Sequence, residues 1–308
     1  TQLHHLRNPE LLRPLLLGHE GTGIVTHVGS SVSHLREGDH AIVTWVPRTP
    51  IKGRTPPDTT GVTYHNKIAH GPVYTWGQDS LINAENVVRI SKKDPTDVSC
   101  IVGCAVLTGA GAVMNTARVR PGDSVAVFGV GGVGLSAIRM AAIIGAHPII
   151  AVDLQDDKLQ FAREFGATQV INASEYDPVQ SVVDMTDGGA DFVFDAVGVR
   201  STTEQILSAT RSGGIGADNL GGIAVLIGVP GLEMTINPRD LLFHQRQYRG
   251  SAGATYPEKD FPMFLRWHRE GKFPLDKLVT RRYKLEKIEE ACNDLEAGKV
   301  LGRAIIEF

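Results

Sequence analysis

GVGGVG, residues 129 to 134, is the stretch that decides the fold of this 308-residue chain. It follows Ser124 to Phe128, a short apolar run that predicts a buried strand, and it opens a helical pattern that continues to about Ile144. The six residues match G-x-G-x-x-G, the turn that places a pyrophosphate at the N-terminus of a helix. A strand, this turn and a helix in that order predict a nucleotide-binding βαβ unit.

Asp153 strengthens this prediction. It ends the next predicted strand, which starts at Pro148, and it lies nineteen residues after Gly134, close to the spacing of about 20 in dinucleotide sites. An acidic side chain there accepts hydrogen bonds from the adenosine ribose and repels a 2′-phosphate; no arginine follows it directly, so NAD is favoured over NADP. The predicted cofactor-binding residues of this region are Gly129, Gly131, Gly132, Val133, Gly134 and Asp153. The alternative interpretation is a similar sheet domain that binds no dinucleotide.

Strands and helices alternate from about residue 106 to residue 252. This alternation predicts an α/β fold with a doubly wound parallel sheet covered by helices on both faces. Further elements are predicted as helices at 156–166, 204–210 and 286–297 and as strands at 168–173, 191–198, 224–230 and 303–308. Residues 1 to about 105 are irregular, with short β-branched runs, and predict a mostly β domain.

Charge and composition exclude several classes of protein. The chain has 31 Lys and Arg against 34 Asp and Glu, a net charge of −3, which argues against nucleic acid or an anionic membrane as partner. No apolar run reaches the roughly 18 residues that a membrane span needs. Cys100, Cys104 and Cys292 form no C-x-x-C pair, so we expect no disulfide framework and a reducing, cytoplasmic location.

His19 and Cys104 are candidate metal ligands. Imidazole and thiolate are the ligand types that suit zinc. His19 precedes a predicted strand, and Cys104 lies 85 residues later, just before the sheet domain. This spacing alone fits a core cysteine and a hydrogen-bonded histidine that bind no metal.

A longer set of motifs bears on this choice. Five stretches follow one another along the chain: LLLGHEGTGIVTHVGSSVSHLREGDHAIV, GCAVLTGAGAVMNTARVRPGDSVAVFGVGGVGL, VGVRSTTEQIL, IGVPG and GRAIIEF. In this order they resemble the medium-chain zinc-dependent alcohol dehydrogenases over essentially the whole chain. The resemblance implies a GroES-like, mostly β catalytic domain at residues 1–105 and 253–308 and an NAD-binding Rossmann domain at residues 106–252. It also implies an active site in the cleft between the two domains.

The resemblance implies one catalytic zinc. His19 and Cys104 resemble two of its ligands, and Glu20 resembles an alternative or neighbouring ligand. A second cysteine ligand of the family would fall two residues before Thr1, so we expect an N-terminal truncation by a few tens of residues. Thr1 resembles the hydroxyl that bonds the substrate oxygen, and His4 resembles the histidine that ends the proton relay. Two solvated surface histidines, His4 and His5, are the alternative interpretation.

The family often carries a structural zinc held by four closely spaced cysteines. Residues 47 to 75 hold five prolines and no cysteine, so a closed tetrahedral site has no thiolates there, and we predict no structural zinc.

Other positions resemble the family's substrate and cofactor contacts. Trp45 and Trp76 resemble aromatic residues of the substrate pocket, where two indoles would favour slim or planar alcohols. The further predicted cofactor contacts are Thr108 and Val229 beside the nicotinamide, Lys158 at the adenosine ribose and Arg303 at the pyrophosphate. The alternatives are that Trp45 and Trp76 are ordinary core residues and that Lys158 and Arg303 are solvated surface charges. The glycine-rich stretch 212–222 has no functional explanation in the sequence.

The expected function is an NAD-dependent alcohol dehydrogenase that acts on a primary or secondary alcohol with one zinc ion. One alternative is a zinc-free quinone or enoyl reductase, which the His19–Glu20 pair, Cys104 and Asp153 disfavour. A polyol dehydrogenase is another, although those tend to place a glutamate at the position of Cys104. A dinucleotide-binding structural or regulatory protein is the non-enzyme alternative. The family implies a homodimer or homotetramer, with an edge strand near residues 248–252 as a candidate for pairing.

Overall fold

The chain divides into two compact units in a computed structural model that describes residues 16–54, 63–69 and 73–308. The first unit consists of Thr1–Leu107 and Thr255–Phe308, and the second of Thr108–Ala254. The boundaries predicted from the sequence, after residues 105 and 252, lie two residues before these divisions.

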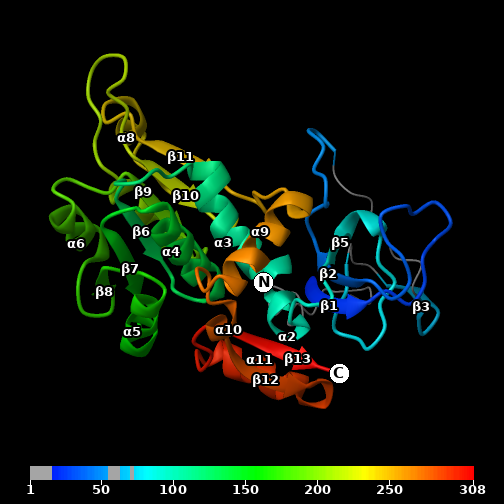
Figure 1. The fold of residues 1–308 in the computed structure, drawn as a ribbon. Helices are drawn as coiled ribbons and strands as arrows, with labels where there is room; N and C mark the ends of the chain where they lie inside the picture. Colours follow the sequence, from blue (N-terminus) through cyan, green and yellow to red (C-terminus); the bar gives the residue numbers. More distant parts are fainter. Residues whose placement is uncertain (1–15, 55–62, 70–72) are drawn as a thin grey trace. The chain divides into compact units, whose positions relative to one another are not determined.

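The second unit, here called the nucleotide unit, is built on a six-stranded parallel sheet (Figure 1). Its strands are β6 (Val125–Phe128), β7 (Ile149–Asp153), β8 (Gln169–Asn172), β9 (Phe192–Asp195), β10 (Ile223–Leu226) and β11 (Gln247–Gly250). Their order across the sheet is β11-β10-β9-β6-β7-β8. The chain therefore winds outward from β6 in one direction and from β9 in the other, and the carboxyl ends of these two strands form the topological switch point where such sheets bind ligands.

Helices connect the strands of this sheet. They are α4 (Gly132–Ile144), α5 (Asp156–Glu164), α6 (Pro178–Met185), α7 (Arg200–Ser208) and the short α8 (Pro238–Leu242). The direction of winding reverses between β6 and β9. Because each crossover is right-handed, α4 and α5 lie on one face of the sheet and α6 and α7 on the other, and α6 packs on α7. Apolar side chains of the strands are fully buried beneath them, which confirms the predicted doubly wound α/β fold.

The first unit, here called the metal unit, contains smaller sheets. An antiparallel sheet joins β1 (Glu20–Ile24), β2 (His40–Thr44) and β5 (Val87–Ile90), and a two-stranded parallel sheet joins β12 (Val279–Lys284) and β13 (Arg303–Glu307). The hairpin of β3 (Thr63–Tyr64) and β4 (Lys67–Ile68) lies between β2 and β5 in sequence. The helices are α2 (Thr96–Ser99), α3 (Ala105–Gly111), α9 (Pro257–Arg269), α10 (Leu275–Leu278) and α11 (Ile288–Glu296), with α3 continuing into the nucleotide unit. Short 3₁₀ turns occur at η1 (Ala84–Asn86), η2 (Cys100–Gly103) and η4 (Leu285–Lys287), and α3 is followed by a π-helical segment, η3 (Ala112–Ala117).

Several elements differ from the sequence prediction. Helix α7 begins at Arg200, four residues before the predicted start; its N-cap is Val199, whose side chain cannot cap a helix, so the sequence gives no capping signal at the true start. Helix α9 was not predicted, since Pro262 lies inside it and proline normally ends a helical pattern. The predicted edge strand is confirmed at β11, which forms one edge of the six-stranded sheet.

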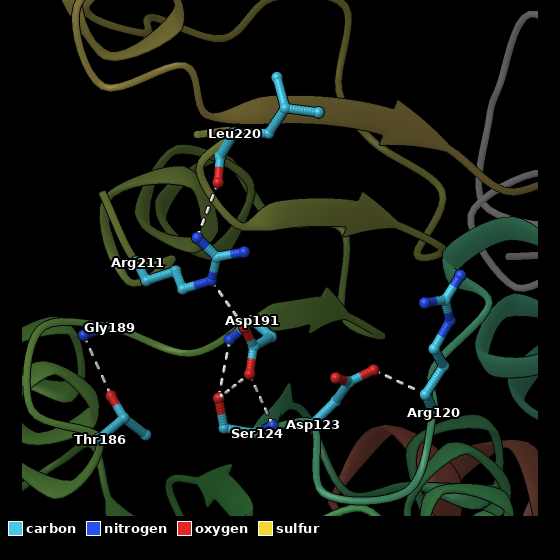
Figure 2. A network of polar contacts seen from close by, with 8 residues as sticks. All are labelled: Arg120, Asp123, Ser124, Thr186, Gly189, Asp191, Arg211 and Leu220. Carbon is cyan, nitrogen blue, oxygen red and sulfur yellow. Dashed lines mark hydrogen bonds and ion pairs between the residues drawn. The ribbon is translucent and has the colours of Figure 1, made fainter. Parts of the chain in front are cut away.

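A polar network at the amino ends of β6 and β9 explains part of the glycine-rich stretch 212–222 (Figure 2). Asp191 accepts hydrogen bonds from the backbone nitrogen and the hydroxyl of Ser124, at 2.9 and 2.7 Å, and from Arg211 Nε at 2.6 Å. Arg211 also donates to the carbonyl oxygen of Leu220 at 2.7 Å. The stretch is therefore fastened to the edge of the sheet opposite the switch point, and the network gives it a structural role.

Among the described residues, no single helix is long and apolar enough to cross a membrane; a bent pair, Thr96–Gly103 and Ala105–Ala117, meets the length and composition criteria only jointly.

Candidate active site

The glycine-rich turn after β6 requires glycine at two positions. Gly129 has a φ of +86°, and a Cβ there would overlap a methyl group of Val197. A Cβ at Gly134 would overlap the carbonyl oxygen of Gly129. These two glycines therefore let the turn close tightly between β6 and α4.

Gly131 differs from those glycines because it faces open space. No atom lies within 4 Å of a Cβ built there, and no side chain caps the first turn of α4, whose N-cap is Gly131. The backbone N–H groups at the start of this 13-residue helix are thus available to an anion. The fit to a pyrophosphate rests on this open approach.

Asp153 lies at the carboxyl end of β7, beside the turn. Its Oδ2 accepts a hydrogen bond from the backbone nitrogen of Val130 at 2.9 Å, and its Oδ1 accepts one from Leu154 at 2.8 Å. The structure therefore joins Asp153 to the glycine-rich turn. Lys158 and Val133 are both half-buried on the helices that follow.

Apolar side chains are exposed at the same edge of the sheet. Val197, Val199 and Val229 are 44%, 51% and 66% exposed, after the carboxyl ends of β9 and β10. A Cβ at Gly198 would overlap the backbone of Gly228 and Val229, so the two connections lie against each other. Exposed apolar surface beside an open helix N-terminus fits a ligand that combines a phosphate with planar rings. Thr108, in α3, has a buried hydroxyl with no hydrogen-bond partner in the described part of the chain.

In the metal unit, the structure brings His19 and Cys104 together. His19 Nε2 lies 3.1 Å from Cys104 Sγ, although the two residues are 85 positions apart. Gly18, with a φ of +82°, allows the close approach of Thr75 and Trp76 to the His19 segment. Gly103 likewise allows η2 to approach the carbonyl oxygen of Val43, which brings Cys104 to the start of β1.

Glu20 and Arg303 form an ion pair beside these two residues. Glu20 also accepts a hydrogen bond from the backbone nitrogen of Ala105 at 3.1 Å. Burial lowers the pKa of Arg303 to about 10, and its Nε has no hydrogen-bond partner within residues 16–54, 63–69 and 73–308. Burial and, secondarily, the charge of Arg303 lower the pKa of His19 to about 4, so its imidazole is neutral, the form that binds metals.

An imidazole nitrogen and a cysteine sulfur that face each other fit two ligands of a zinc site. No group of three His, Cys, Asp or Glu side chains able to hold a metal occurs among the described residues. Thr1 and His4, predicted to take part in catalysis, lie outside the described residues, and no structural statement applies to them.

Trp45 and Trp76 flank the His19 segment. Trp45 directly follows Thr44, which pairs with Glu20 across β1 and β2. The backbone nitrogen of Trp76 donates to the carbonyl of Leu17 at 3.0 Å, and its indole lies next to Gly18. The Nε1 of Trp45 is buried with no hydrogen-bond partner in the part of the chain that the structure describes. The Trp76 indole therefore lies beside the His19 segment, and Trp45 follows the strand residue that pairs with Glu20.

A part of the proline-rich segment is fastened by charged residues. Arg54 forms an ion pair with Glu85 at 2.8 Å, and the backbone nitrogen of Arg48 donates to the carbonyl of Glu85 at 2.6 Å. Neither this pair nor the pairing of Arg303 with Glu20 is predictable from the sequence, because neither spacing forms a local motif.

Comparison with known proteins places the chain in a family. A model of the alcohol dehydrogenase GroES-like domain matches residues 2–92, and a model described as zinc-binding dehydrogenase matches residues 132–270. The chain is 34% identical to S-(hydroxymethyl)glutathione dehydrogenase of Saccharomyces cerevisiae over 96% of its own length and 82% of that protein.

Solved structures agree with this match. A benzyl alcohol dehydrogenase from Acinetobacter calcoaceticus superposes with a TM-score of 0.87 at 30% identity, covering 100% of this chain and 88% of that one. An alcohol dehydrogenase zinc-binding domain protein from Burkholderia ambifaria gives a TM-score of 0.85 at 31% identity, covering 97% and 85%. The chain therefore belongs to the medium-chain zinc-dependent alcohol dehydrogenases, a family of oxidoreductases.

Proposed function

We propose that this protein is an NAD-dependent alcohol dehydrogenase that uses one catalytic zinc to interconvert a primary or secondary alcohol with an aldehyde or ketone. The observation that carries the proposal is the distance of 3.1 Å between His19 Nε2 and Cys104 Sγ, because a pairing across 85 residues sets two zinc-type donors face to face. Similarity to the yeast and Acinetobacter dehydrogenases supports the reaction class.

The cofactor would be held by the nucleotide unit. The open N-terminus of α4 at Gly131 would receive the pyrophosphate, with Gly129, Gly132, Val133 and Gly134 forming the turn. Asp153 and Lys158 would contact the adenosine ribose, and Thr108 and Val229 would lie beside the nicotinamide. Arg303, whose Nε lacks a partner among the described residues, would contact the pyrophosphate. NAD supplies the acceptor for the hydride of the alcohol.

The metal would be held by His19 and Cys104, with Glu20 as an alternative or neighbouring ligand. Zinc in such a site supplies a Lewis acid that makes an alcohol easier to deprotonate near neutral pH. Burial and, secondarily, the charge of Arg303 lower the pKa of His19 to about 4, which keeps its imidazole in the neutral form that a ligand needs. The Thr1 hydroxyl would bond the substrate oxygen, and the His4 imidazole would deliver the released proton to water.

Trp45 and Trp76 would form the walls of the substrate pocket. The Trp76 indole lies beside the His19 segment, and two indoles in the pocket would favour a slim or planar alcohol. The similarity to a dehydrogenase named for benzyl alcohol, which is planar, agrees with this preference. A homodimer or homotetramer, the absence of a structural zinc and a cytoplasmic location belong to the same proposal, as do domain limits of 1–105, 106–252 and 253–308.

Metal content and cofactor reduction test the proposal together. Zinc per chain is measured by elemental analysis of the full-length protein, and NAD reduction is followed with benzyl alcohol before and after a chelator. About one zinc per chain, with alcohol-dependent NADH formation abolished by the chelator, is the expected result. Two zinc ions per chain would show that the proline-rich segment holds a second site. A protein that contains no zinc would be assigned instead to the zinc-free quinone or enoyl reductases.

A further inference from the structure

Asp195, the last residue of β9, is a fully buried carboxylate that the proposed reaction does not use; it is 0% exposed. Its Oδ1 accepts hydrogen bonds from the backbone nitrogens of Val197 and Gly198 at 2.8 and 3.0 Å. Its Oδ2 accepts one from the Thr203 hydroxyl at 3.0 Å. No cation pairs with it in the part of the chain that the structure describes, so these donors compensate the buried charge.

The three residues after Asp195, Ala196–Gly198, form a turn at the switch point. The backbone nitrogen of Ala196 donates to the carbonyl of Phe128 at 2.9 Å, next to the glycine-rich turn. A methyl group of Val197 occupies the place that a Cβ at Gly129 would need. The turn therefore packs directly against the first residue of the G-x-G-x-x-G stretch.

The same turn packs on the connection after β10. Gly198 has a φ of +85° and lies against the backbone of Gly228 and Val229. The backbone nitrogens of Ile227 and Gly228 both donate to the carbonyl oxygen of Asp195 at 2.9 Å. One turn thus touches the residues proposed for the pyrophosphate and the residue proposed for the nicotinamide.

We propose that Asp195 is a positioning residue for dinucleotide binding: its carboxylate fixes the Ala196–Gly198 turn, which in turn fixes the spacing between the Gly129 turn and Val229. The inference rests on the proposed function, because it assumes that a dinucleotide binds at this edge of the sheet. Asp195 itself, being fully buried, acts through the turn.

The other end of β9 provides a matched control. Asp191 directly precedes this strand and is likewise held by Ser124 and Arg211 (Figure 2). It lies at the amino edge of the sheet, away from the switch point. Truncation of either carboxylate removes three hydrogen bonds from one strand, and only one of the two lies at the proposed cofactor edge.

The experiment compares Asp195→Ala with Asp191→Ala in the full-length protein. The Kd for NAD is measured by calorimetry, and amide hydrogen exchange at residues 196–198 is followed without cofactor. Because hydrogen bonds to a charged group are lost, we expect Asp195→Ala to weaken NAD binding by about 10-fold or more and to speed exchange in the turn by a similar factor. Asp191→Ala is expected to lower the Tm and to leave the Kd within about 2-fold.

Two milder variants keep the test decisive if Asp195→Ala does not fold. Asp195→Asn retains an acceptor for Val197 and Gly198 and can donate to Thr203, so it should keep the Kd within about 3-fold of the unchanged protein. Thr203→Val removes one of the three donors, and it should weaken binding about 3-fold with zinc content unchanged.

Equal weakening by Asp191→Ala and Asp195→Ala would overturn the inference, because the effect would then be general destabilisation. An unchanged Kd in Asp195→Ala would overturn it as well. If the unchanged protein itself binds no NAD, the proposed function fails. Faster amide exchange at residues 196–198 in Asp195→Ala would then still support the role of Asp195 in holding the turn. Equal exchange in the two proteins would overturn the inference.

Discussion

The candidate functional residues of the nucleotide unit lie close together in sequence, whereas those of the metal unit are far apart. Gly129 to Gly134 form one uninterrupted stretch, a turn and the start of α4, and Asp153 follows on the neighbouring strand. His19 meets Cys104 across 85 residues, and Glu20 meets Arg303, which lies in the last strand. The first kind of site is a property of local backbone geometry, and the second kind exists only once distant segments have packed together.

This difference explains which parts of the sequence were informative. A glycine-rich turn between a strand and a helix has a local physical reason for each glycine, so its pattern is visible without the fold. A histidine and a cysteine 85 positions apart carry no such pattern, and only the family resemblance connected them. Because the two sites are built by different segments, we expect that each can be removed without the other.

The largest effect is expected from His19→Ala. Loss of one of the two donors described here should reduce bound zinc to a small fraction of one ion per chain and lower alcohol-dependent NAD reduction by at least about 100-fold. The Kd for NAD should stay within about 2-fold, because the glycine-rich turn is built by its own unit. Elemental analysis, kinetics and calorimetry measure the three quantities.

Cys292→Ala serves as the control for this prediction, since Cys292 lies on α11 and should leave the zinc content unchanged. A loss of NAD binding in His19→Ala equal to the loss of zinc would contradict the independence of the two sites.

Gly131→Val should weaken NAD binding and leave zinc binding unchanged, the reverse of His19→Ala. A Cβ at Gly131 meets no atom within 4 Å, so the Tm should remain within about 2 °C of that of the unchanged protein, whereas the added side chain occupies the approach to the N-terminus of α4. We expect NAD binding to weaken by about 10-fold to 100-fold with zinc content unchanged.

Gly134→Ala tests the contrasting role. Its Cβ would overlap the carbonyl oxygen of Gly129, so we expect it to lower the Tm strongly. Normal NAD binding in Gly131→Val would show that the open space at the helix N-terminus is not where the pyrophosphate lies.

Much of the fold followed from the sequence, and the exceptions have physical causes. The βαβ alternation predicted the parallel sheet, and the edge strand expected near residues 248–252 is β11. Helix α9 escaped prediction because Pro262 interrupts its pattern, yet Phe261 and Phe264 are fully buried, so packing of its apolar face outweighs the missing backbone donor.

The site was predictable to a different degree in each unit. Asp153 was expected to bond a ribose, and the structure adds that it bonds Val130 and so also holds the glycine-rich turn. The partner of Arg303 was not predictable, because an ion pair between two elements leaves no spacing in the sequence. Asp195 was not singled out either, although an aspartate at a strand end followed three residues later by glycine is a signal that could have identified a held turn.

Arg303→Met tests the proposed contact of Arg303 with the pyrophosphate. Arg303 forms an ion pair with Glu20, and its Nε lacks a partner among the described residues; under the proposed function its guanidinium would contact the pyrophosphate. Its removal should weaken NAD binding by about 10-fold, measured by calorimetry. If the Kd is unchanged and only zinc content or the Tm falls, Arg303 serves Glu20 alone and the units are independent.

The smallest effect is expected at the amino edge of the nucleotide unit, where Asp191 is held by Ser124 and Arg211, residues distant from it in sequence. Burial alone would raise the pKa of Asp191, but hydrogen bonds from Ser124 and Arg211 lower it below its ordinary value. A carboxyl whose pKa is lower in the folded state stabilises the protein above its unfolded pKa of about 4, and this contribution is lost as the pH falls through the folded pKa. Asp191→Asn should therefore lower the Tm by about 2–4 °C at pH 7 and by progressively less below about pH 4. A Tm difference between the two proteins that stays constant from pH 7 to pH 3 would mean that the charge of Asp191 contributes nothing. A difference that vanishes as the pH falls would show that the stability of this unit, too, depends on residues outside its sequence motif.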